Sequence, residues 1–244
     1  TIPLELGNLV NLTFLGLADT ELEGPIPATL GNLTALQGLD LSFCRLSGLL
    51  PAELGNLTGL RHLFLRGNRL SGQLPASLGN LVNLEELRID GNQLSGPIPT
   101  PLTALTALVP SLTNIGYNAL YSSDETLLAF LNTKDPDWAA TQTIAPTGVT
   151  ATSLDNAVVL VSWLPIPYTA DAGYYRVLIS ETAGGPYTLA GQTENKTTTA
   201  VNVIGLTPGA RYYFVVQTHT DAHANNENIV ESEYSAEASA MAWL

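Results

Sequence analysis

Residues 50–73 read LPAELGNLTGLRHLFLRGNRLSGQ, and residues 74–97 read LPASLGNLVNLEELRIDGNQLSGP. The same pattern also begins at Ile2, Ile26 and Ile98, so successive starts are always 24 residues apart. A fixed period of this length is typical of a solenoid, because one coil cannot bury its own apolar side chains whereas stacked coils bury a continuous column. The pattern predicts a stack of about five coils in the first half of the chain.

The leucines within each repeat follow the order LxxLxLxxNxL, in which LxL is a short strand and the asparagine lies in the turn after it. At Asn68 and Asn92 a buried carboxamide is expected to bond to backbone groups left unpaired by that turn. Thr20 and Cys44 occupy the same position in the first two repeats, so the single cysteine has a structural explanation.

Side chains alternate along a strand, so the residues that flank the leucines of LxL are predicted to line the concave face of the solenoid. These candidate binding residues are Phe14, Asp40, Phe43, His62, Phe64, Arg66, Glu86, Arg88 and Asp90. Three aligned aromatic rings on an exposed sheet indicate contact with a partner. The charged members have an alternative interpretation, in which they pair across neighbouring strands and keep the face soluble, with each pair contributing about 0–1 kcal/mol.

The combined motif LSGxIPxxLGNLxxL resembles the plant-type leucine-rich-repeat class of receptor kinase ectodomains and polygalacturonase inhibitors, from residue 2 to about 108. The resemblance implies that the concave face holds a protein, peptide or glycan. Plant members generally carry cysteine-paired caps, and this chain has one cysteine. Bacterial secreted and cell-surface proteins with the same repeat do not need such caps, and the chain is therefore interpreted as similar to those.

A change of pattern follows the repeats, which are assigned to residues 1–120. Residues 121–144 are predicted to form a helical cap and linker, with Ser122 or Ser123 as the helix N-cap. The helix is expected over residues 121–132 with an apolar face that seals the leucine column, and Trp138 is expected to pack on that seal. The residues of the apolar face are Leu127, Leu128, Phe130 and Leu131.

Residues 145–244 show the alternation of an all-β sandwich, with about seven short strands separated by Gly, Pro, Asn and Asp turns. The segment LTPGARYYFVV, residues 206–216, resembles the fibronectin type III domain at the turn into its sixth strand. The resemblance implies that Tyr212 is the corner tyrosine, that Trp163 is the buried tryptophan of the second strand, and that Tyr175 lies on the third strand. Such domains serve as spacers as often as receptors.

Catalytic residues, cofactors and metal sites are not expected, because no nucleophile, phosphate-loop, dinucleotide or zinc-protease motif is present. The segment with His219, Asp221 and His223 carries imidazoles and a carboxylate that could bind a metal, but its spacing matches no defined ligand set. This segment and the following NNENIVESE are predicted to form a solvated loop between the sixth and seventh strands.

The charge balance of 9 Lys and Arg against 22 Asp and Glu gives a net charge of −13, which argues against nucleic-acid binding. No apolar run reaches the length of about 18 residues that a membrane span requires, so insertion into a membrane is not expected. The chain begins inside a repeat, and any secretion signal is expected to lie outside it. We therefore expect an extracellular or cell-surface location.

The sequence is compatible with three functions. The first is a non-enzymatic binding module whose concave face takes a protein, peptide or glycan. The second is a structural subunit of a fibre, sheath or surface layer that self-associates through the exposed first repeat, since the open end of a leucine column needs cover. The third, with least support, is an enzyme whose chemistry comes from a neighbouring domain outside this chain.

Overall fold

The computed structural model describes residues 1–243, which divide into two compact units. The first unit is Thr1–Gln142 together with Ala224–Asn228, a short segment that comes from the second half of the sequence. The second unit consists of the other described residues, 143–223 and 229–243. The fold is that of a leucine-rich-repeat solenoid with one helix after the repeats, and then an antiparallel sandwich.

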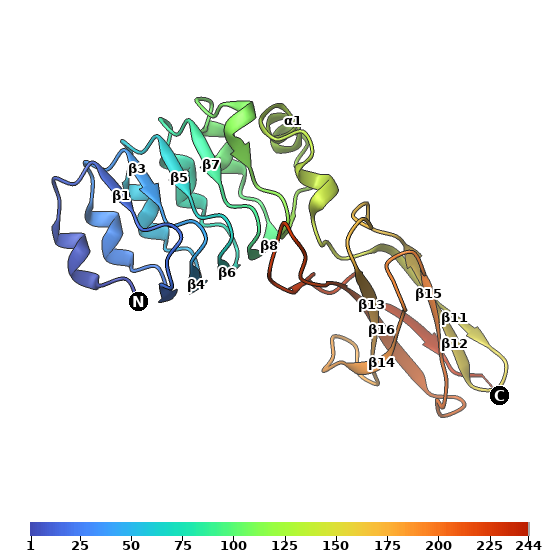
Figure 1. Ribbon diagram of the computed structural model, residues 1–244. Coiled ribbons are helices and arrows are strands. Elements are labelled where there is room, and N and C mark those ends of the chain that lie inside the picture. Colours follow the sequence, from blue (N-terminus) through green and yellow to red (C-terminus); the bar gives the residue numbers. More distant parts are fainter. Residues whose placement is uncertain (244) are drawn as a thin grey trace. The chain divides into compact units, whose positions relative to one another are not determined.

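Two parallel sheets run along the solenoid, and each coil contributes one strand to each sheet (Figure 1). The first sheet consists of β1 (Phe14–Gly16), β3 (Gly38–Asp40), β5 (His62–Phe64), β7 (Glu86–Arg88) and β9 (Thr113–Asn114). The second sheet consists of β2 (Glu23–Gly24), β4 (Arg45–Gly48), β6 (Arg69–Gly72), β8 (Gln93–Pro97) and β10 (Ala119–Tyr121). Because coils stack in register, residues 24 apart, such as Leu15 and Leu39, are partners in the first sheet.

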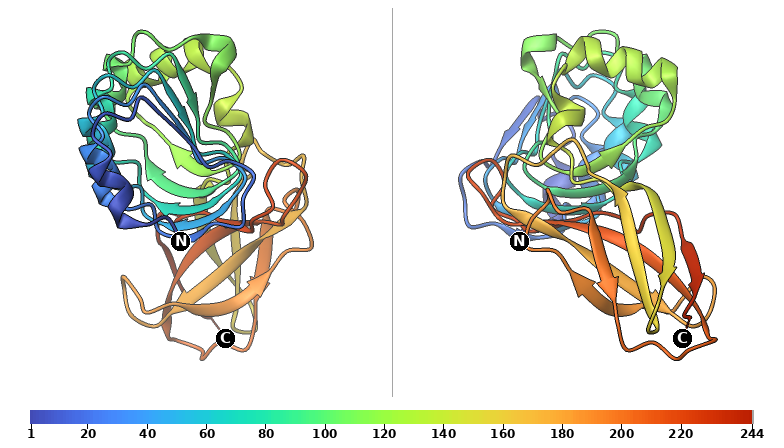
Figure 2. Two further views of the ribbon diagram at one scale, coloured as in Figure 1. Left: turned by 60° about the vertical axis from the view of Figure 1, so that its left-hand side comes forward. Right: turned by 90° about the vertical axis from the view of Figure 1, so that its right-hand side faces the viewer.

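The opposite side of each coil is a short 3₁₀ helix, which the end-on view in Figure 2 shows on the outside of the stack. The glycine of each LGN motif lies where two coils approach closely. A Cβ added at Gly31 would lie 2.4 Å from the backbone oxygen of Glu53 in the next coil, so a larger residue would separate the coils. The 3₁₀ helices of the coils are η1 (Leu4–Asn8), η2 (Ala28–Asn32), η3 (Ala52–Asn56), η4 (Ala76–Asn80), η5 (Thr100–Ala104) and η6 (Pro110–Leu112).

The predicted asparagine ladder is confirmed. The side chain of Asn92 is fully buried, accepts a hydrogen bond from Leu70 N at 3.1 Å and donates to Leu65 O and Ile89 O at 3.0 Å each. Cys44 takes the same position with longer contacts, its Sγ lying 3.3 Å from Leu17 O. The sequence did not reveal that Gln142 extends the ladder beyond the last coil. The side-chain amides that form the ladder are Asn68, Asn92, Asn118 and Gln142.

The end of the leucine column is covered by α1 (Glu125–Lys134), which is followed by the 3₁₀ helix η7 (Trp138–Thr141). The predicted cap is confirmed, since Leu127, Leu131 and Trp138 are buried in the same apolar cluster as the repeat leucines, with Leu128 and Phe130 partly buried against it. The predicted helix start at residue 121 is wrong, because residues 119–121 form β10. The predicted N-cap is wrong. Asp124, not a serine, accepts hydrogen bonds from Thr126 N and Leu127 N, because its carboxylate reaches both free amides of the first turn.

The second unit contains two antiparallel sheets, as the sequence pattern predicted. One sheet has the order β11-β12-β15, and the other has the order β14-β13-β16-β17 with β18 also paired to β16. The strands are β11 (Thr147–Leu154), β12 (Val158–Leu164), β13 (Gly173–Ser180), β14 (Thr188–Gln192), β15 (Ala200–Val203), β16 (Arg211–Thr220), β17 (Val230–Glu231) and β18 (Ala238–Met241).

The three aromatic residues singled out from the sequence occupy the core of the sandwich as expected. Trp163 lies on β12 and packs edge-on against Tyr175 of β13, with ring centroids 5.2 Å apart. The hydroxyl of Tyr212 on β16 accepts a hydrogen bond from Thr207 N at 3.1 Å, which is the contact of a tyrosine corner. None of the described helices is long and apolar enough to cross a membrane.

Candidate functional site

The outward face of the first sheet carries the predicted binding residues in rows that run across the coils. Strand register places two rows on the strands themselves, and backbone hydrogen bonds continue two more rows into the turn after each strand. The first row is Phe14, Gly38, His62 and Glu86, and the second is Gly16, Asp40, Phe64, Arg88 and Asn114. The third row is Ser42, Arg66, Asp90 and Gly116, and the fourth is Asp19, Phe43, Gly67, Gly91 and Tyr117.

The predicted alignment of three aromatic rings is wrong, because Phe14, Phe43 and Phe64 lie in three different rows. Phe43 is not on a strand but in the turn after β3, with φ at +53°. Strands of the first sheet end before this position, and glycine occupies it in the third and fourth coils. Glycine at two of the equivalent positions was the available signal in the sequence, because glycine favours a positive φ.

The two most exposed of these rings lie on glycines. Phe14 is 58% exposed, and Cβ atoms added at Gly16 and Gly38 would lie 2.8 and 2.6 Å from its ring carbons. Phe43 is 49% exposed and covers Gly67 in the same way, at 2.6 Å. The absence of side chains beneath the rings lets each ring lie close to the backbone, and about half of each ring residue remains exposed to a partner.

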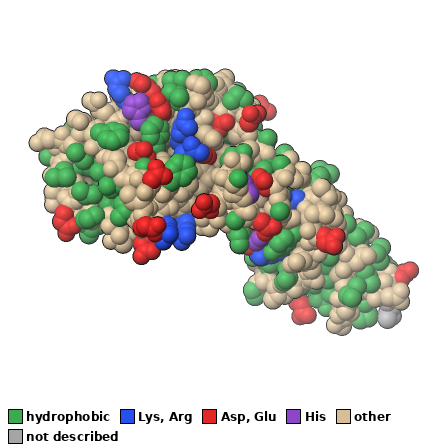
Figure 3. Space-filling view, viewed as in Figure 1, with side chains coloured by type: hydrophobic (Ala, Val, Ile, Leu, Met, Phe, Trp, Pro, Cys, Tyr) green, Lys and Arg blue, Asp and Glu red, His purple; other side chains and the backbone are tan. Residues whose placement is uncertain are grey.

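The charged residues of the face pair in part across neighbouring coils, as the alternative interpretation predicted. Arg66 Nε lies 3.4 Å from Asp90 Oδ2, and His62 Nδ1 lies 3.6 Å from Glu86 Oε1. Arg66 also stacks on the ring of Phe43, with its guanidinium carbon 4.8 Å from the ring centroid. Figure 3 shows charges of both signs interspersed with apolar side chains over the first unit.

Asp90 is not part of the exposed surface that the sequence predicted, since only 4% of it is exposed. Burial raises the pKa of its carboxyl, although the neighbouring Arg66 and Arg88 favour the charged form. Asp90 Oδ1 and Arg66 Nε have no hydrogen-bond partner among the described residues. The pair is therefore better described as part of the framework than as a recognition surface.

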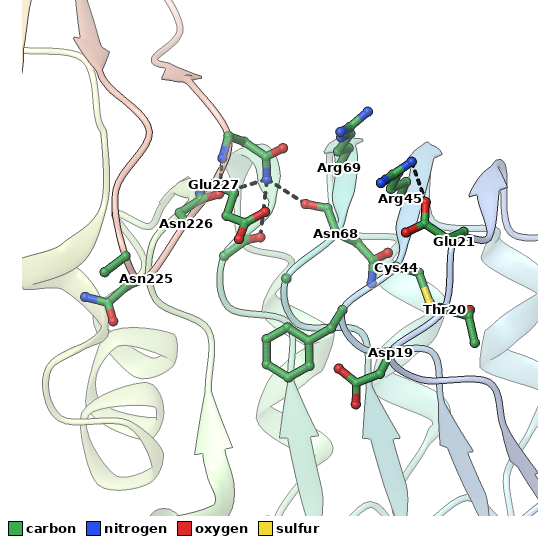
Figure 4. Close-up of a pocket in the computed structure, with 15 residues that line it drawn as sticks. Asp19, Thr20, Glu21, Cys44, Arg45, Asn68, Arg69, Asn225, Asn226 and Glu227 are labelled. Carbon is green, nitrogen blue, oxygen red and sulfur yellow. Dashed lines mark hydrogen bonds and ion pairs between the residues drawn. The ribbon is translucent and has the colours of Figure 1, made fainter.

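A pocket of about 420 Å³ lies within the first unit, beside the fourth row. Its lining comes from the turns of successive coils, around Thr20, Cys44 and Asn68, and from residues 224–228 (Figure 4). The exposed ring of Phe43 is one wall. Charges of both signs surround the pocket, and Glu21 and Arg45 form an ion pair of 2.5 Å at its edge.

Residues 224–228 are held by their asparagine side chains. Asn226 Nδ2 donates to the backbone oxygens of Asn92 and Tyr117, at 2.8 Å each. Asn228 Nδ2 donates to the oxygens of Asn68, at 2.6 Å, and Gly91, at 3.4 Å. The prediction of a solvated loop is wrong here, because Asn226 is only 2% exposed. The NxN spacing was the available signal, but it does not identify its acceptors.

The two histidines weighed as a metal site have separate partners in the second unit. His219 stacks on Tyr174 with centroids 4.4 Å apart and lies 3.2 Å from both Glu231 and Asp221, whereas His223 Nδ1 lies 3.3 Å from Asp171. Burial lowers the pKa of His223, despite the opposing charge of Asp171. Within residues 1–243, no group of three or more His, Cys, Asp or Glu side chains is placed to hold a metal ion.

Lys196 is a buried amine of the second unit, with 2% of the residue exposed. Its Nζ lies 4.3 Å from the centroid of the Tyr168 ring and donates to Thr220 Oγ1 at 3.2 Å. Burial lowers the pKa of Lys196 to about 8, although Asp171 and Asp221 oppose the shift. The side chain therefore lies in an environment that disfavours its charged form.

Comparison with known proteins agrees with this architecture. A family model described as a leucine-rich repeat region matches residues 4–128, and one described as a fibronectin type III domain matches residues 144–231. No curated protein matches the chain significantly.

Among solved structures, the plant peptide hormone receptor RGFR1 in complex with RGF2 is 38% identical over 54% of this chain, with a TM-score of 0.50. The Arabidopsis receptor kinase HAESA, in complex with the peptide hormone IDA and the co-receptor SERK1, is 39% identical over 54% of this chain, also with a TM-score of 0.50. The match spans 21% of the first receptor chain and 22% of the second, about a fifth of either.

Proposed function

Because the chain belongs to the leucine-rich-repeat family and also carries a fibronectin type III domain, we propose that it is a non-enzymatic binding module. The outward face of the first sheet would hold a protein or peptide, with a glycan as the less favoured ligand, and the sandwich would act as a spacer. We further propose that the protein works outside the cell or at its surface, as the related receptor ectodomains suggest.

The observation that carries the proposal is the exposure of Phe14, at 58%, on a face where its ring lies on the glycines Gly16 and Gly38. An exposed aromatic ring supported by backbone offers a large contact area at little cost in side-chain entropy. The relatives named above are receptors whose structures contain bound peptide hormones, and this favours a peptide over a glycan.

The test is a selection of linear peptides from a random displayed library on the whole chain, followed by affinity measurement on variants. We expect Phe14→Ala to weaken the selected peptides by about tenfold. Val82→Ala is the matched control, since Val82 is 51% exposed but does not belong to the rows of the first sheet. Equal affinities for wild type, Phe14→Ala and Val82→Ala would refute the assignment of the site.

A second candidate function, a structural subunit of an extracellular assembly, rests on the first coil. Leu9 is 50% exposed, whereas the equivalent Leu33 and Leu57 of the next two coils are fully buried. Association through this surface should appear in light scattering as a mass that grows with concentration, and Leu9→Glu should abolish that growth. A monomeric wild type at high concentration would contradict this alternative.

A further inference from the structure

The hydrogen bonds of residues 224–228 follow a rule that repeats from coil to coil. Each asparagine amide donates to two backbone oxygens, one from the ladder residue of a coil and one from the fourth-row residue of the coil after it. Asn226 uses Asn92 O and Tyr117 O, and Asn228 uses Asn68 O and Gly91 O. An NH₂ group suits this arrangement because it carries two donors on one atom.

The same pair of acceptors recurs one and two coils earlier. One coil earlier, the ladder residue is Cys44 and the fourth-row residue is Gly67. Two coils earlier, they are Thr20 and Phe43. All four residues line the pocket of about 420 Å³, and residues 224–228 line it as well. The amides of Asn226 and Asn228 donate to the oxygens of the later coils and do not reach those of Cys44 or Gly67.

The geometry points to this pocket as a second binding site, which takes a peptide whose Asn or Gln side chains, two residues apart in a turn like that of residues 224–228, donate to the carbonyls of the first three coils. Residues 224–228 show the mode of binding, because Asn226 Oδ1 also accepts from both N and Nδ2 of Asn228 and so draws the two amides together. The two amides thereby reach acceptors on successive coils, whose neighbouring strands lie about 4.8 Å apart.

The surroundings favour a neutral amide over other donors. A hydroxyl group has one hydrogen to donate and leaves one carbonyl of each pair unsatisfied, which disfavours a glycan. The charges at the rim are of both signs, with Asp19 and Glu21 near Arg45 and Arg69, so a strongly charged side chain gains little. The ring of Phe43 adds an apolar wall against which the stem of a Gln or the backbone of the ligand can pack.

The probe for this site is the synthetic peptide AHANNENIV, which copies residues 222–230. It is added to the ¹⁵N-labelled full chain, and backbone amide shifts are followed. We expect saturable shifts at residues 19–21 and 43–45, with a dissociation constant of about 1 mM. A peptide with Ala in place of both amide residues that correspond to Asn226 and Asn228 should bind at least about tenfold more weakly.

Phe43→Gly is the matched protein variant, because glycine occupies the equivalent positions 67 and 91 and suits a positive φ. It should weaken the probe about threefold or more without loss of the fold. Phe14→Ala should leave probe binding unchanged, since Phe14 does not line the pocket. The two variants therefore distinguish a failure of the inference about the pocket from a failure of the proposed function of the outward face.

Three results would overturn the inference. The first is an absence of shifts at about 5 mM probe, and the second is equal binding of the alanine peptide. The third is a set of shifts confined to residues 68, 91, 92 and 117, because the probe would then only displace residues 224–228 from the sites they already hold.

Discussion

The first unit buries a ladder of neutral amides, whereas the second unit buries an amine. Asn92 has no exposed surface and its amide bonds to backbone groups on both sides of the ladder. Lys196 is almost as buried, but its amine contacts a hydroxyl and an aromatic ring, and the charges of Asp171 and Asp221 offset its burial only in part. The comparison shows that burial by itself does not determine whether a polar group stabilises a fold, since the number of satisfied partners decides the sign.

The largest expected effect comes from removing a ladder amide. Asn92→Ala leaves Leu70 N and two buried carbonyls without their partner, so the free energy of unfolding should fall by about 3 kcal/mol. Urea unfolding measures the loss. Asn83→Ala is the control, because Asn83 is exposed and its amide donates, within residues 1–243, only to Thr58 O. A similar, small loss in both variants would show that the ladder is not a main source of stability.

The buried amine of Lys196 should make the stability of the fold depend on pH. The pKa of Lys196 is lowered from 10.5 to about 8 in the folded state, so between these values the unfolded chain binds more protons. Stability contributed by this group must therefore rise with pH from about 8 towards 10, by on the order of 1–2 kcal/mol.

Thermal unfolding of wild type and Lys196→Met at pH 7 and 9.5 measures this effect. The difference in stability between wild type and Lys196→Met should shift in favour of wild type at the higher pH. Lys134→Met provides the control, since Lys134 is the other lysine of the chain and donates to Thr106 O and Leu108 O from a partly exposed position. A parallel pH response of wild type and Lys196→Met would show that the amine is not destabilised in the fold.

A smaller effect is expected where the ladder is imperfect. Cys44 holds the ladder position with an Sγ contact of 3.3 Å, and a carboxamide there would supply both an acceptor and two donors. Cys44→Asn should therefore raise the stability of the first unit by about 1 kcal/mol in the same urea assay. Destabilisation would indicate that the second coil is too narrow at this turn for the larger side chain.

Much of the first unit was predictable because its contacts are local and repeated. The period of 24 residues placed each leucine in the column and each ladder residue in its turn, and the structure confirms both at Leu39, Leu63 and Asn68. The cap was predictable for the same reason, since the open end of a leucine column requires an apolar face and Leu127 and Leu131 provide one.

The candidate site was less predictable. Phe43 follows Leu39 and Leu41 by four and two residues, so alternation alone directs its side chain inward, and the outward ring results from the turn of the backbone to positive φ at this residue. Asp90 was placed on the surface because alternation gives the direction of a side chain but not its burial, which depends on Arg66 and the adjacent coils. Asn226 was assigned to solvent because its acceptors are more than 100 residues away in the chain.

The sequence by itself determined the coil, the ladder, the cap and the sandwich, because each follows from periodic burial of apolar side chains or from a turn motif within a few residues. Only the tertiary structure decided which polar side chains are buried, which aromatic rings lie on glycines, and that residues 224–228 pair with the turns of the later coils. Hydrogen bonds and burial of this kind depend on groups that are distant in sequence, and the periodicity of a sequence does not identify such partners.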